Sequence, residues 1–418
     1  MLLLAPSIAA VDPSITAVDR PPRPSAGCGT KEPFKPSDSP QRFSFSAKDD
    51  TQPEGDAERW YWLNLPKVYE KRTPAALVLS FHGFYDQARD EIYEDSLPTW
   101  IDRHEKNVVT AYPVGSSDVD NDHAAYERFG WNIDGNGLNK ESGPMGPVCD
   151  HERMPADEYT CYKSCRKSAA GCNEKHGCNC ASCMQDSRFV RQLLDRLESE
   201  LCIDLDRIHL TGISNGALMV YQLALDLAGR VASVAPVAGS RFLGYNHQPV
   251  APVALLDIHG YADIYVPANA SARTVTKTTN VTKPLKHRTV VTTTTVTTEV
   301  LAGPAGSIVS EDDFYYTPLA NLTAAFAAAN GCAGGNLPHP TRWDGVRDFS
   351  CNRPHGECGA SAVVQCAGDW GHTWPLHEVY PLAYAELVLD FFKRHPLRNR
   401  GDGAGGDAEG LHDAVEVA

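Results

Sequence analysis

Long hydrophobic runs are absent from this sequence of 418 residues, and no stretch reaches the ~18 consecutive apolar residues that a membrane-spanning helix needs. Positive charge is also scarce, since 38 Lys and Arg stand against 53 Asp and Glu and give a net charge of −15. This balance argues against binding to nucleic acid or to anionic membrane surfaces, and it favours neutral or cationic partners. A repeat of fixed period is missing as well. We therefore expect no membrane span and no nucleic-acid partner.

Cysteine, by contrast, is abundant for an intracellular enzyme. The chain has 13 cysteines, with a dense group between Cys149 and Cys183, and it has glycosylation sequons at Asn269, Asn280 and Asn321. The first residues, "MLLLAPSIAAVD", are similar to the tail of a signal peptide, with an apolar patch and small residues at its end but no basic segment. Together these features predict a secreted, extracellular protein.

The cysteine-rich segment 149–183 has two interpretations. Thiolates at short spacings are zinc ligands, and His176 lies among them. In a secreted chain the same pattern favours disulfides, which we prefer, although the pairing does not follow from the sequence. We expect no bound metal and no cofactor. Four further cysteines are expected to form bridges ahead of residue 372, namely Cys332, Cys351, Cys358 and Cys366.

Composition divides the chain into three parts. Residues 1–55 are rich in Pro, Ser and charge and are predicted to be a flexible leader. Residues 56–397 are predicted to form one catalytic domain, and residues 398–418 a disordered tail rich in Gly, Asp and Ala. Two insertions interrupt the domain: the cysteine-rich segment 149–183, and the Thr-rich segment 272–300, which is either a hairpin or a glycosylated loop.

Strand-like and helix-like segments alternate through the catalytic domain. "AALVLSF" (75–81) and "NVVTAYP" (107–113) are continuous apolar runs, as buried parallel strands are. "DSRFVRQLLDRLESEL" (186–201) places its apolar side chains on one helical stripe. Further strands are predicted at 58–66, 207–212, 231–239, 252–260 and 361–368, and a last helix at about 378–394. This alternation predicts an α/β fold with a mostly parallel central sheet flanked by helices.

Ser214 lies between Gly212 and Gly216 in "TGISNGALM", after a predicted strand and before a predicted helix. In α/β-hydrolases G-x-S-x-G forms a sharp strand-to-helix turn, where small neighbours leave room and the serine hydroxyl is exposed. The alternative is a tight turn that only uses small residues, and the strand–helix context argues against it. Ser214 is therefore the candidate nucleophile.

A nucleophilic serine needs a base, and the base needs an orienting carboxylate. In this fold they follow in the order Ser, then Asp or Glu, then His. "DIHGYADIYVP" offers Asp257 and Asp263, and we prefer Asp263 because it lies in the loop after the strand, where ligand sites collect. "GDWGHTWP" places His372 in the loop after the last strand, with His377 as its nearest rival. An ordinary surface histidine is the alternative interpretation of His372.

Two backbone N–H groups are expected to stabilise the oxyanion that forms during acyl transfer. One belongs to Asn215, directly after the nucleophile. The other comes from the loop "HGFYD", where we favour the amide of Phe84 and expect Gly83 to allow a close approach. A plain turn is the alternative interpretation of "HG".

Several motifs occur together in one order, and they carry a resemblance: "SFHG", "GWN" (130–132), "DSRFVRQLLDRL", "TGISNGALM", "APVAG", "IHGYADIYVP" and "GHTWP". Over roughly residues 75–395 the chain resembles the secreted feruloyl esterase and polyhydroxybutyrate depolymerase family (carbohydrate esterase family 1-like), which has the α/β-hydrolase fold. The resemblance implies metal-independent ester hydrolysis through an acyl-enzyme, with Ser214 as nucleophile, Asp263 as acid and His372 as base. The substrate cleft is expected at His82, Gly83 and Trp374, although packing is an equally good role for Trp374.

The sequence thus predicts a secreted serine esterase that acts on feruloyl or acetyl esters of cell-wall polysaccharide. An aliphatic polyester, such as polyhydroxybutyrate, is the alternative substrate, and the sequence does not decide between the two. A hypothesis of another class is a catalytically silent binding or cell-surface protein on a hydrolase scaffold, against which the intact Ser, Asp and His argue. The chain departs from the family by keeping only Asp186 where a pair of acids is usual.

Overall fold

The computed structural model describes most of the chain from residue 21 to residue 397. The described ranges are 21–30, 33–50, 55–105, 107–117, 129–133, 142–150, 184–245, 247–269, 273–284, 290–301, 303–304, 307–359, 361–377 and 379–397. The cysteine-rich segment beyond residue 150 and the predicted tail lie outside these ranges, so the choice between zinc and disulfides in that segment is not tested.

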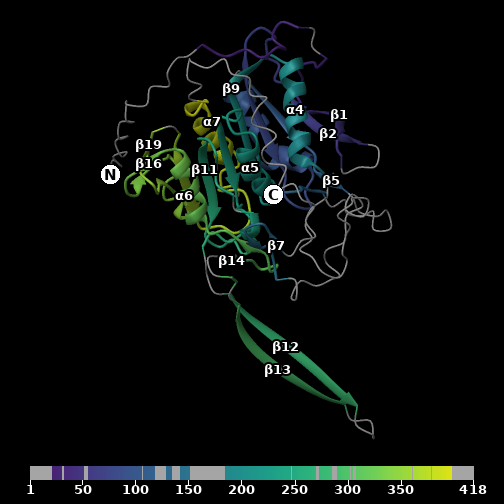
Figure 1. The fold of residues 1–418 in the computed structure, drawn as a ribbon, viewed down its shortest axis with the longest axis vertical. Coiled ribbons are helices and arrows are strands. Elements are labelled where there is room, and N and C mark those ends of the chain that lie inside the picture. The colour runs from purple at the N-terminus through teal and green to yellow at the C-terminus, as the bar shows by residue number, and fades with distance from the viewer. Residues whose placement is uncertain are drawn as a thin grey trace, which may run out of the picture.

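A ten-stranded sheet forms the centre of the molecule (Figure 1). Its six middle strands are parallel, as the continuous apolar runs predicted, and antiparallel strands close both edges. In spatial order the strands are β1 (Gln41–Lys48), β2 (Asp56–Asn64), β4 (Val108–Pro113), β3 (Ala75–Phe81), β9 (Ile203–Ile213), β10 (Ser233–Val237), β11 (Ala254–Gly260), β20 (Val363–Gly368), β18 (Ser350–Arg353) and β17 (Leu337–Pro338).

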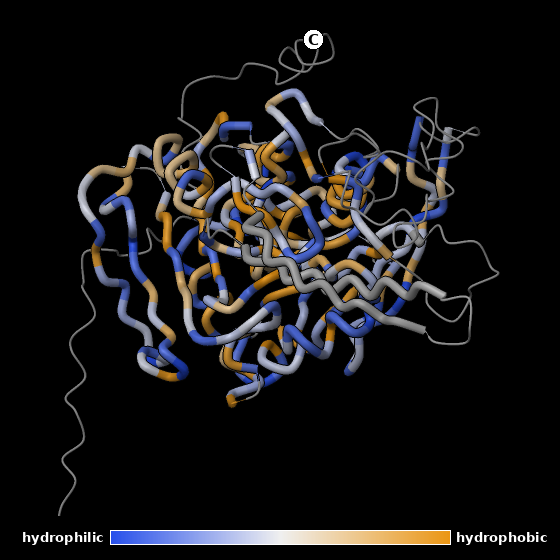
Figure 2. Tube along the Cα trace, turned by 90° about the horizontal axis from the view of Figure 1, so that it is seen from below, coloured by the Kyte–Doolittle hydropathy of each residue, from blue (hydrophilic) through white to orange (hydrophobic). Residues whose placement is uncertain are grey.

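Helices cover both faces of this sheet and enclose a hydrophobic core on each. Neighbouring residues of β3 alternate between the two cores: Leu77 and Leu79 belong to one, and Val78 to the other. The first core lies under α4 (Asp186–Glu200), α5 (Asn215–Asp226) and α6 (Leu319–Ala329), and the second under α2 (Leu97–His104) and α7 (Ala383–Arg394). Figure 2 shows hydrophobic residues gathered along the inner segments of the chain, as this layered arrangement requires.

Short elements connect this frame. Helix α1 (Ala88–Glu94) follows β3, and short 3-10 turns lie at Leu243–Tyr245 and Val346–Asp348. The small strands are β5 (Ser116–Ser117), β6 (Phe129–Gly130), β7 (Ser142–Gly143), β8 (Gly146–Pro147), β14 (Ile308–Val309), β15 (Tyr315–Tyr316), β16 (Cys332–Ala333) and β19 (Glu357–Cys358). Within the described residues, no helix combines the length and the apolar character needed to cross a membrane.

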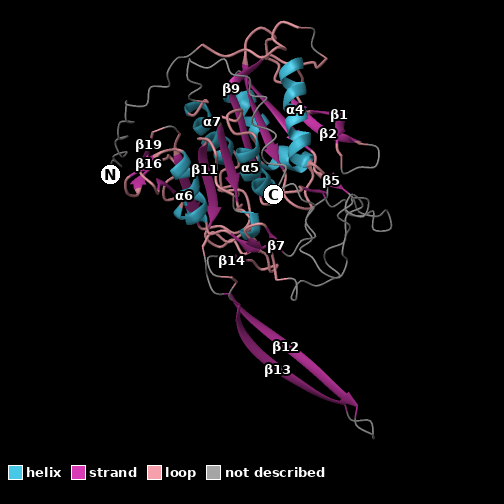
Figure 3. Cartoon of the chain, in the orientation of Figure 1, coloured by secondary structure: helices cyan, strands magenta, loops and turns pink. Residues whose placement is uncertain are grey.

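The Thr-rich segment forms a hairpin that extends away from the body of the molecule (Figure 3). Its strands are β12 (Arg273–Pro284) and β13 (Val290–Leu301), which pair only with each other, in antiparallel register from Arg273↔Leu301 to Pro284↔Val290. Of the two interpretations offered by the sequence, the hairpin is therefore the one found. Whether Asn280, which pairs with Thr294, is glycosylated stays a prediction.

Much of the predicted leader belongs to the folded domain. Strand β1 pairs along its whole length with β2, and Cys28 forms a disulfide with Cys202. Phe43 and Phe45 alternate along β1 and pack against Tyr61. The sequence reading missed this strand because the Pro- and Ser-rich composition around it hid a period-two pattern of only two aromatic residues.

Two further disulfides lie ahead of residue 372. They join Cys332 to Cys358 and Cys351 to Cys366, so the four cysteines expected to form bridges in this region do so. The second bridge ties β18 to β20, the strand that leads into the loop of His372.

Candidate active site

Ser214 lies at the sharp turn between β9 and α5. Its backbone has φ 56° and ψ −123°, a strained region for a residue with a side chain. Its neighbours must be small: a Cβ on Gly212 would lie 2.5 Å from the carbonyl oxygen of Phe81, and one on Gly216 only 2.0 Å from that oxygen. The Ser214 amide is held by the carbonyl of Val237 at 3.0 Å. The strand–helix turn expected from G-x-S-x-G is therefore present, and the serine is partly exposed on it.

Asp263 is held by donors on both of its carboxylate oxygens. Oδ1 accepts hydrogen bonds from the amides of Tyr265 (3.0 Å) and Val266 (2.9 Å). Oδ2 accepts one from Nδ1 of His372 at 2.9 Å, and Nε2 of His259 lies 3.4 Å from the same oxygen. Burial alone would raise the pKa of Asp263, but the hydrogen bonds from the two histidines outweigh it and lower the pKa to about 2.

The structure thus brings Asp263 and His372 together, although they are far apart in the sequence. Asp257, the alternative acid, is fully buried and instead accepts a hydrogen bond from Tyr221 at 2.8 Å. Among the described residues, no hydrogen bond joins the Ser214 hydroxyl to His372. Both side chains are partly exposed, and such hydrogen bonds are often long without substrate and tighten when it binds.

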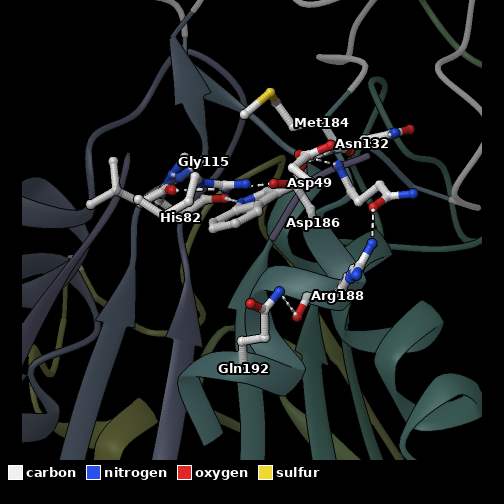
Figure 4. Close-up of polar contacts among 12 residues, drawn as sticks. Asp49, His82, Gly115, Asn132, Met184, Asp186, Arg188 and Gln192 are labelled. Carbon is white, nitrogen blue, oxygen red and sulfur yellow. Dashed lines mark hydrogen bonds and ion pairs between the residues drawn. The ribbon is translucent and has the colours of Figure 1, made fainter. Parts of the chain in front are cut away.

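His82 orients the loop that was expected to supply an oxyanion donor. Its Nε2 accepts a hydrogen bond from the Gly115 amide at 2.9 Å, which leaves the proton on Nδ1 to bond the carbonyl of Gly83 at 2.8 Å (Figure 4). Burial lowers the pKa of His82 to about 4, so the ring is neutral. In a trans peptide the N–H points opposite to the C=O. Fixing the Gly83 carbonyl therefore fixes the direction of the Phe84 N–H.

The second expected donor is the N–H of Asn215. As the first residue of α5 it has no partner within the helix. Its side chain is engaged elsewhere, because Oδ1 accepts a hydrogen bond from the Trp131 amide at 2.8 Å. The Trp131 indole in turn donates to the carbonyl of His82 at 3.0 Å. The "GWN" segment therefore connects the two loops that carry the candidate donors.

The positions of the three candidate residues decide the fold family. Ser214 follows β9, Asp263 follows β11 and His372 follows β20, all at the carboxyl ends of parallel strands of one sheet. The chain has the α/β-hydrolase fold. The order Ser, Asp, His along the chain and the strained turn at the serine are those of this fold.

Comparison with known proteins finds partial matches to esterases. No protein-family profile matches the chain. It is 30% identical over 79 residues to the bifunctional acetylxylan esterase/xylanase XynS20E of Neocallimastix patriciarum, a match covering 19% of this chain and 12% of that protein. It is 32% identical over 83 residues to "Probable feruloyl esterase C" of Aspergillus niger, covering 20% of this chain and 30% of that protein. The chain thus spans less than a third of the length of either relative.

Solved structures show only a distant likeness. An acetyl xylan esterase from Aspergillus awamori is 10% identical, with 85% of this chain and 99% of that chain covered and a TM-score of 0.44. The native structure of pOPH is 13% identical, with 89% and 90% covered and a TM-score of 0.43. At these values the fold assignment rests on the sheet order and on the turn at Ser214.

A buried ion pair supports the side of the site where the candidate oxyanion donors lie. Arg59 on β2 and Asp186 at the start of α4 lie 2.5 Å apart, Nη2 to Oδ1, and both side chains are almost completely buried. The other oxygen of Asp186 accepts a hydrogen bond from the Asn132 amide at 2.6 Å (Figure 4). Asp186 therefore holds the "GWN" segment. No local motif marks Arg59, the partner of Asp186 from a distant strand, as a buried residue.

Two residues expected at the substrate cleft are not at the surface. His82 is fully buried, and Trp374 is 4% exposed. The indole of Trp374 packs on Tyr384, with ring centroids 4.4 Å apart, and donates a hydrogen bond to Glu94 at 3.1 Å. Both side chains therefore support the loops around the site, because neither has surface left for a substrate. Gly83 is buried as well, next to the side chain of Ser214.

The sequence reading also missed a carboxyl group in the loop of the candidate oxyanion donor Phe84. Asp86 follows Phe84 by two residues and is partly buried. Burial, and then the like charges of Glu94 and Asp90, raise the pKa of Asp86 to about 6, although His372 acts in the opposite direction. Its influence depends on tertiary neighbours, which no local motif reveals. Among the described residues, no group of three or more His, Cys, Asp or Glu side chains is arranged to hold a metal ion.

Proposed function

We propose that this chain is a secreted serine esterase that hydrolyses carboxylic esters, with feruloyl or acetyl esters of cell-wall polysaccharide as its substrates. The observation that carries the proposal is the 2.9 Å hydrogen bond between Asp263 and His372, at the same sheet edge as the strained turn of Ser214. An acid, a base and a partly exposed serine at one edge are the parts that acyl transfer needs.

The proposed reaction follows from these positions. Asp263 holds the proton of His372 on Nδ1, so Nε2 is free to take the proton of the Ser214 hydroxyl as the oxygen attacks the ester carbonyl. The N–H groups of Phe84 and Asn215 stabilise the oxyanion, and His372 returns the proton to the leaving alcohol. Water then releases the acid from the acyl-enzyme by the same steps. No metal takes part in this scheme.

Exposed aromatic rings support the proposed substrate class. Tyr85, next to the candidate oxyanion donor, is 43% exposed, and its ring packs on that of Phe84. Tyr265, next to the acid loop, is 48% exposed, and its ring centroid lies 5.5 Å from that of His372. Partly solvent-exposed aromatic rings can stack against a sugar or a feruloyl group. The names of the two curated relatives, a feruloyl esterase and an acetylxylan esterase, agree with this choice.

Disulfides support the secreted location. Cys28–Cys202, Cys332–Cys358 and Cys351–Cys366 are bonded, and structural disulfides form and persist in oxidising compartments.

Turnover of methyl ferulate and p-nitrophenyl acetate tests the proposal. Ser214→Ala should lower kcat by at least about a thousandfold, because loss of one member of such a triad removes the nucleophile or its activation. Ser199→Ala, at an exposed serine on α4, is the matched control and should leave kcat unchanged. Equal rates for the wild type and Ser214→Ala would overturn the proposal. If the protein clears a polyhydroxybutyrate suspension but hydrolyses neither ester, the serine hydrolase mechanism stands and the substrate is an aliphatic polyester.

A further inference from the structure

Asp86 lies beside the candidate nucleophile. A Cβ built on Gly83 would meet Oδ2 of Asp86 at 2.7 Å and Cβ of Ser214 at 3.6 Å. The carboxyl group and the serine side chain therefore lie on the same side of Gly83, the residue whose carbonyl direction sets the Phe84 donor. A group this close to the serine is also close to any ester that the serine attacks.

The charge of Asp86 is not neutralised by a partner. In the described part of the chain, its carboxyl group accepts no hydrogen bond and forms no ion pair. The charged groups that shift its pKa are Glu94 and Asp90 of α1, which have the same sign, and His372. The charge of Asp86 in turn helps to raise the pKa of Glu91, a buried acid on the same helix.

Asp312 lies in a loop joined to the acid loop by the hydrogen bond from Glu311 to Ile264. Burial raises the pKa of Asp312, and the charge of His372 acts in the opposite direction. Three carboxyl groups therefore lie near His372: Asp263, which is hydrogen-bonded to it, and Asp86 and Asp312, which interact with it through charge.

A negative charge at this position has a definite effect on substrates. An anionic group on the acyl part of an ester bound at Ser214 would lie near Asp86, in a partly buried setting where water screens charges incompletely. A neutral ester meets no such repulsion. Its acid product becomes a carboxylate after deacylation, and the same repulsion then favours release.

We propose that Asp86 is a specificity-determining residue, which makes the site reject esters with a negative charge near the scissile carbonyl and accept neutral or cationic ones. This inference rests on the proposed function of Ser214. Because the pKa of Asp86 is raised to about 6, the rejection should be strong above that pH and weak below it.

The test compares kcat/KM for two esters of similar size. One is p-nitrophenyl butyrate, which is neutral, and the other is p-nitrophenyl 3-sulfopropanoate, whose sulfonate stays ionised at every pH used. At about pH 8, Asp86→Asn should raise the ratio of anionic to neutral kcat/KM by about tenfold, and at about pH 5 the ratio should barely change. Asp86→Glu, which keeps the charge, should retain the wild-type ratio at both pH values.

Asp102→Asn is the matched control, since it removes an exposed carboxylate from α2. It should leave the ratio as in the wild type. If Asp86→Asn also leaves the ratio unchanged at about pH 8 while turnover still requires Ser214, the inference about Asp86 is wrong and the proposed function stands. If neither ester is turned over in a Ser214-dependent way, the proposed function itself fails.

Discussion

The loop after β11 and the loop between β3 and α1 each carry a carboxyl group that interacts with His372, but they hold it differently. Asp263 receives two backbone N–H groups and two histidine nitrogens, and its pKa falls to about 2 although it is buried. Asp86 receives no such donors, and its pKa rises to about 6. The donors around a carboxyl group, more than its burial, therefore decide whether it is a fixed anion or a group that titrates near neutral pH.

Helix α1 and the turn after it carry two more carboxyl groups whose pKa values are raised, as that of Asp86 is. Glu91 and Asp95 are both fully buried, and one oxygen of each has no hydrogen-bond partner among the described residues. Ser80 and Tyr112 donate to the remaining oxygens at 2.9 and 3.2 Å. Burial raises the pKa of Asp95 to about 8, and burial together with the charge of Asp95 raises the pKa of Glu91 well above its usual value. At neutral pH, Glu91 and Asp95 are therefore protonated, whereas Asp263 is ionised.

The largest expected effect comes from removing the negative charge of Asp263. Asp263→Asn should lower kcat on p-nitrophenyl acetate by roughly 10³ to 10⁴, because an amide neither fixes the Nδ1 proton of His372 nor stabilises the ring when it becomes charged. Steady-state kinetics check this, with Asp102→Asn as the control. A loss of less than about tenfold would contradict the role given to Asp263.

The next prediction concerns the stability of the fold. It adds to the comparison a third buried carboxyl group, Asp186, which is paired with the charged Arg59. Arg59→Met should lower the free energy of unfolding at neutral pH by about 3–5 kcal/mol, because it leaves Asp186 buried and unpaired. Arg42→Met, at an exposed arginine on β1, is the control and should cost about 1 kcal/mol or less. Urea denaturation measures the free energy of unfolding of both variants. An equal decrease in the two would show that the buried ion pair is no more important for stability than an exposed arginine.

The smallest effect concerns the protonated pair near α1. An acid whose pKa is higher in the folded than in the unfolded protein stabilises the fold fully below the unfolded pKa, and this stabilisation is lost as the pH rises toward the folded value. For Asp95 that window runs from 3.8 to about 8. The wild type should therefore lose about 1 kcal/mol relative to Asp95→Asn between about pH 6 and about pH 7. Parallel stability curves for the two proteins would contradict a protonated Asp95.

Local patterns predicted the parts of this site that depend on local geometry. The turn at Ser214 was predicted from Gly212 and Gly216. Only glycine fits at these two positions, because any side chain would collide with the carbonyl of Phe81. The choice of Asp263 over Asp257 follows from its place in a loop, where backbone N–H groups are free to reach it. The central strands were found because a strand buried on both faces has to be apolar throughout.

The features that sequence reasoning missed arise from contacts between distant segments. Arg59 and Asp186 are 127 residues apart, and nothing around Arg59 marks it as buried. The role of His82 as a support comes from Gly115, which the sequence does not place beside it. Asp86 gains its raised pKa from burial and from the like charges of Glu94 and Asp90 on α1, against the opposing effect of His372. Such roles come from the fold as a whole, because each depends on which segments meet.

Labelling with a fluorophosphonate probe, followed by peptide mapping, tests most directly the claim that Ser214, His372 and Asp263 act as one unit. The probe reacts with a serine only when a neighbouring base activates it. The wild type should gain a single adduct on the peptide containing Ser214, His372→Ala and Asp263→Asn should react far more slowly, and Ser214→Ala should not react. An unlabelled wild type, or labelling of Ser214 at the same rate without His372, would contradict the account.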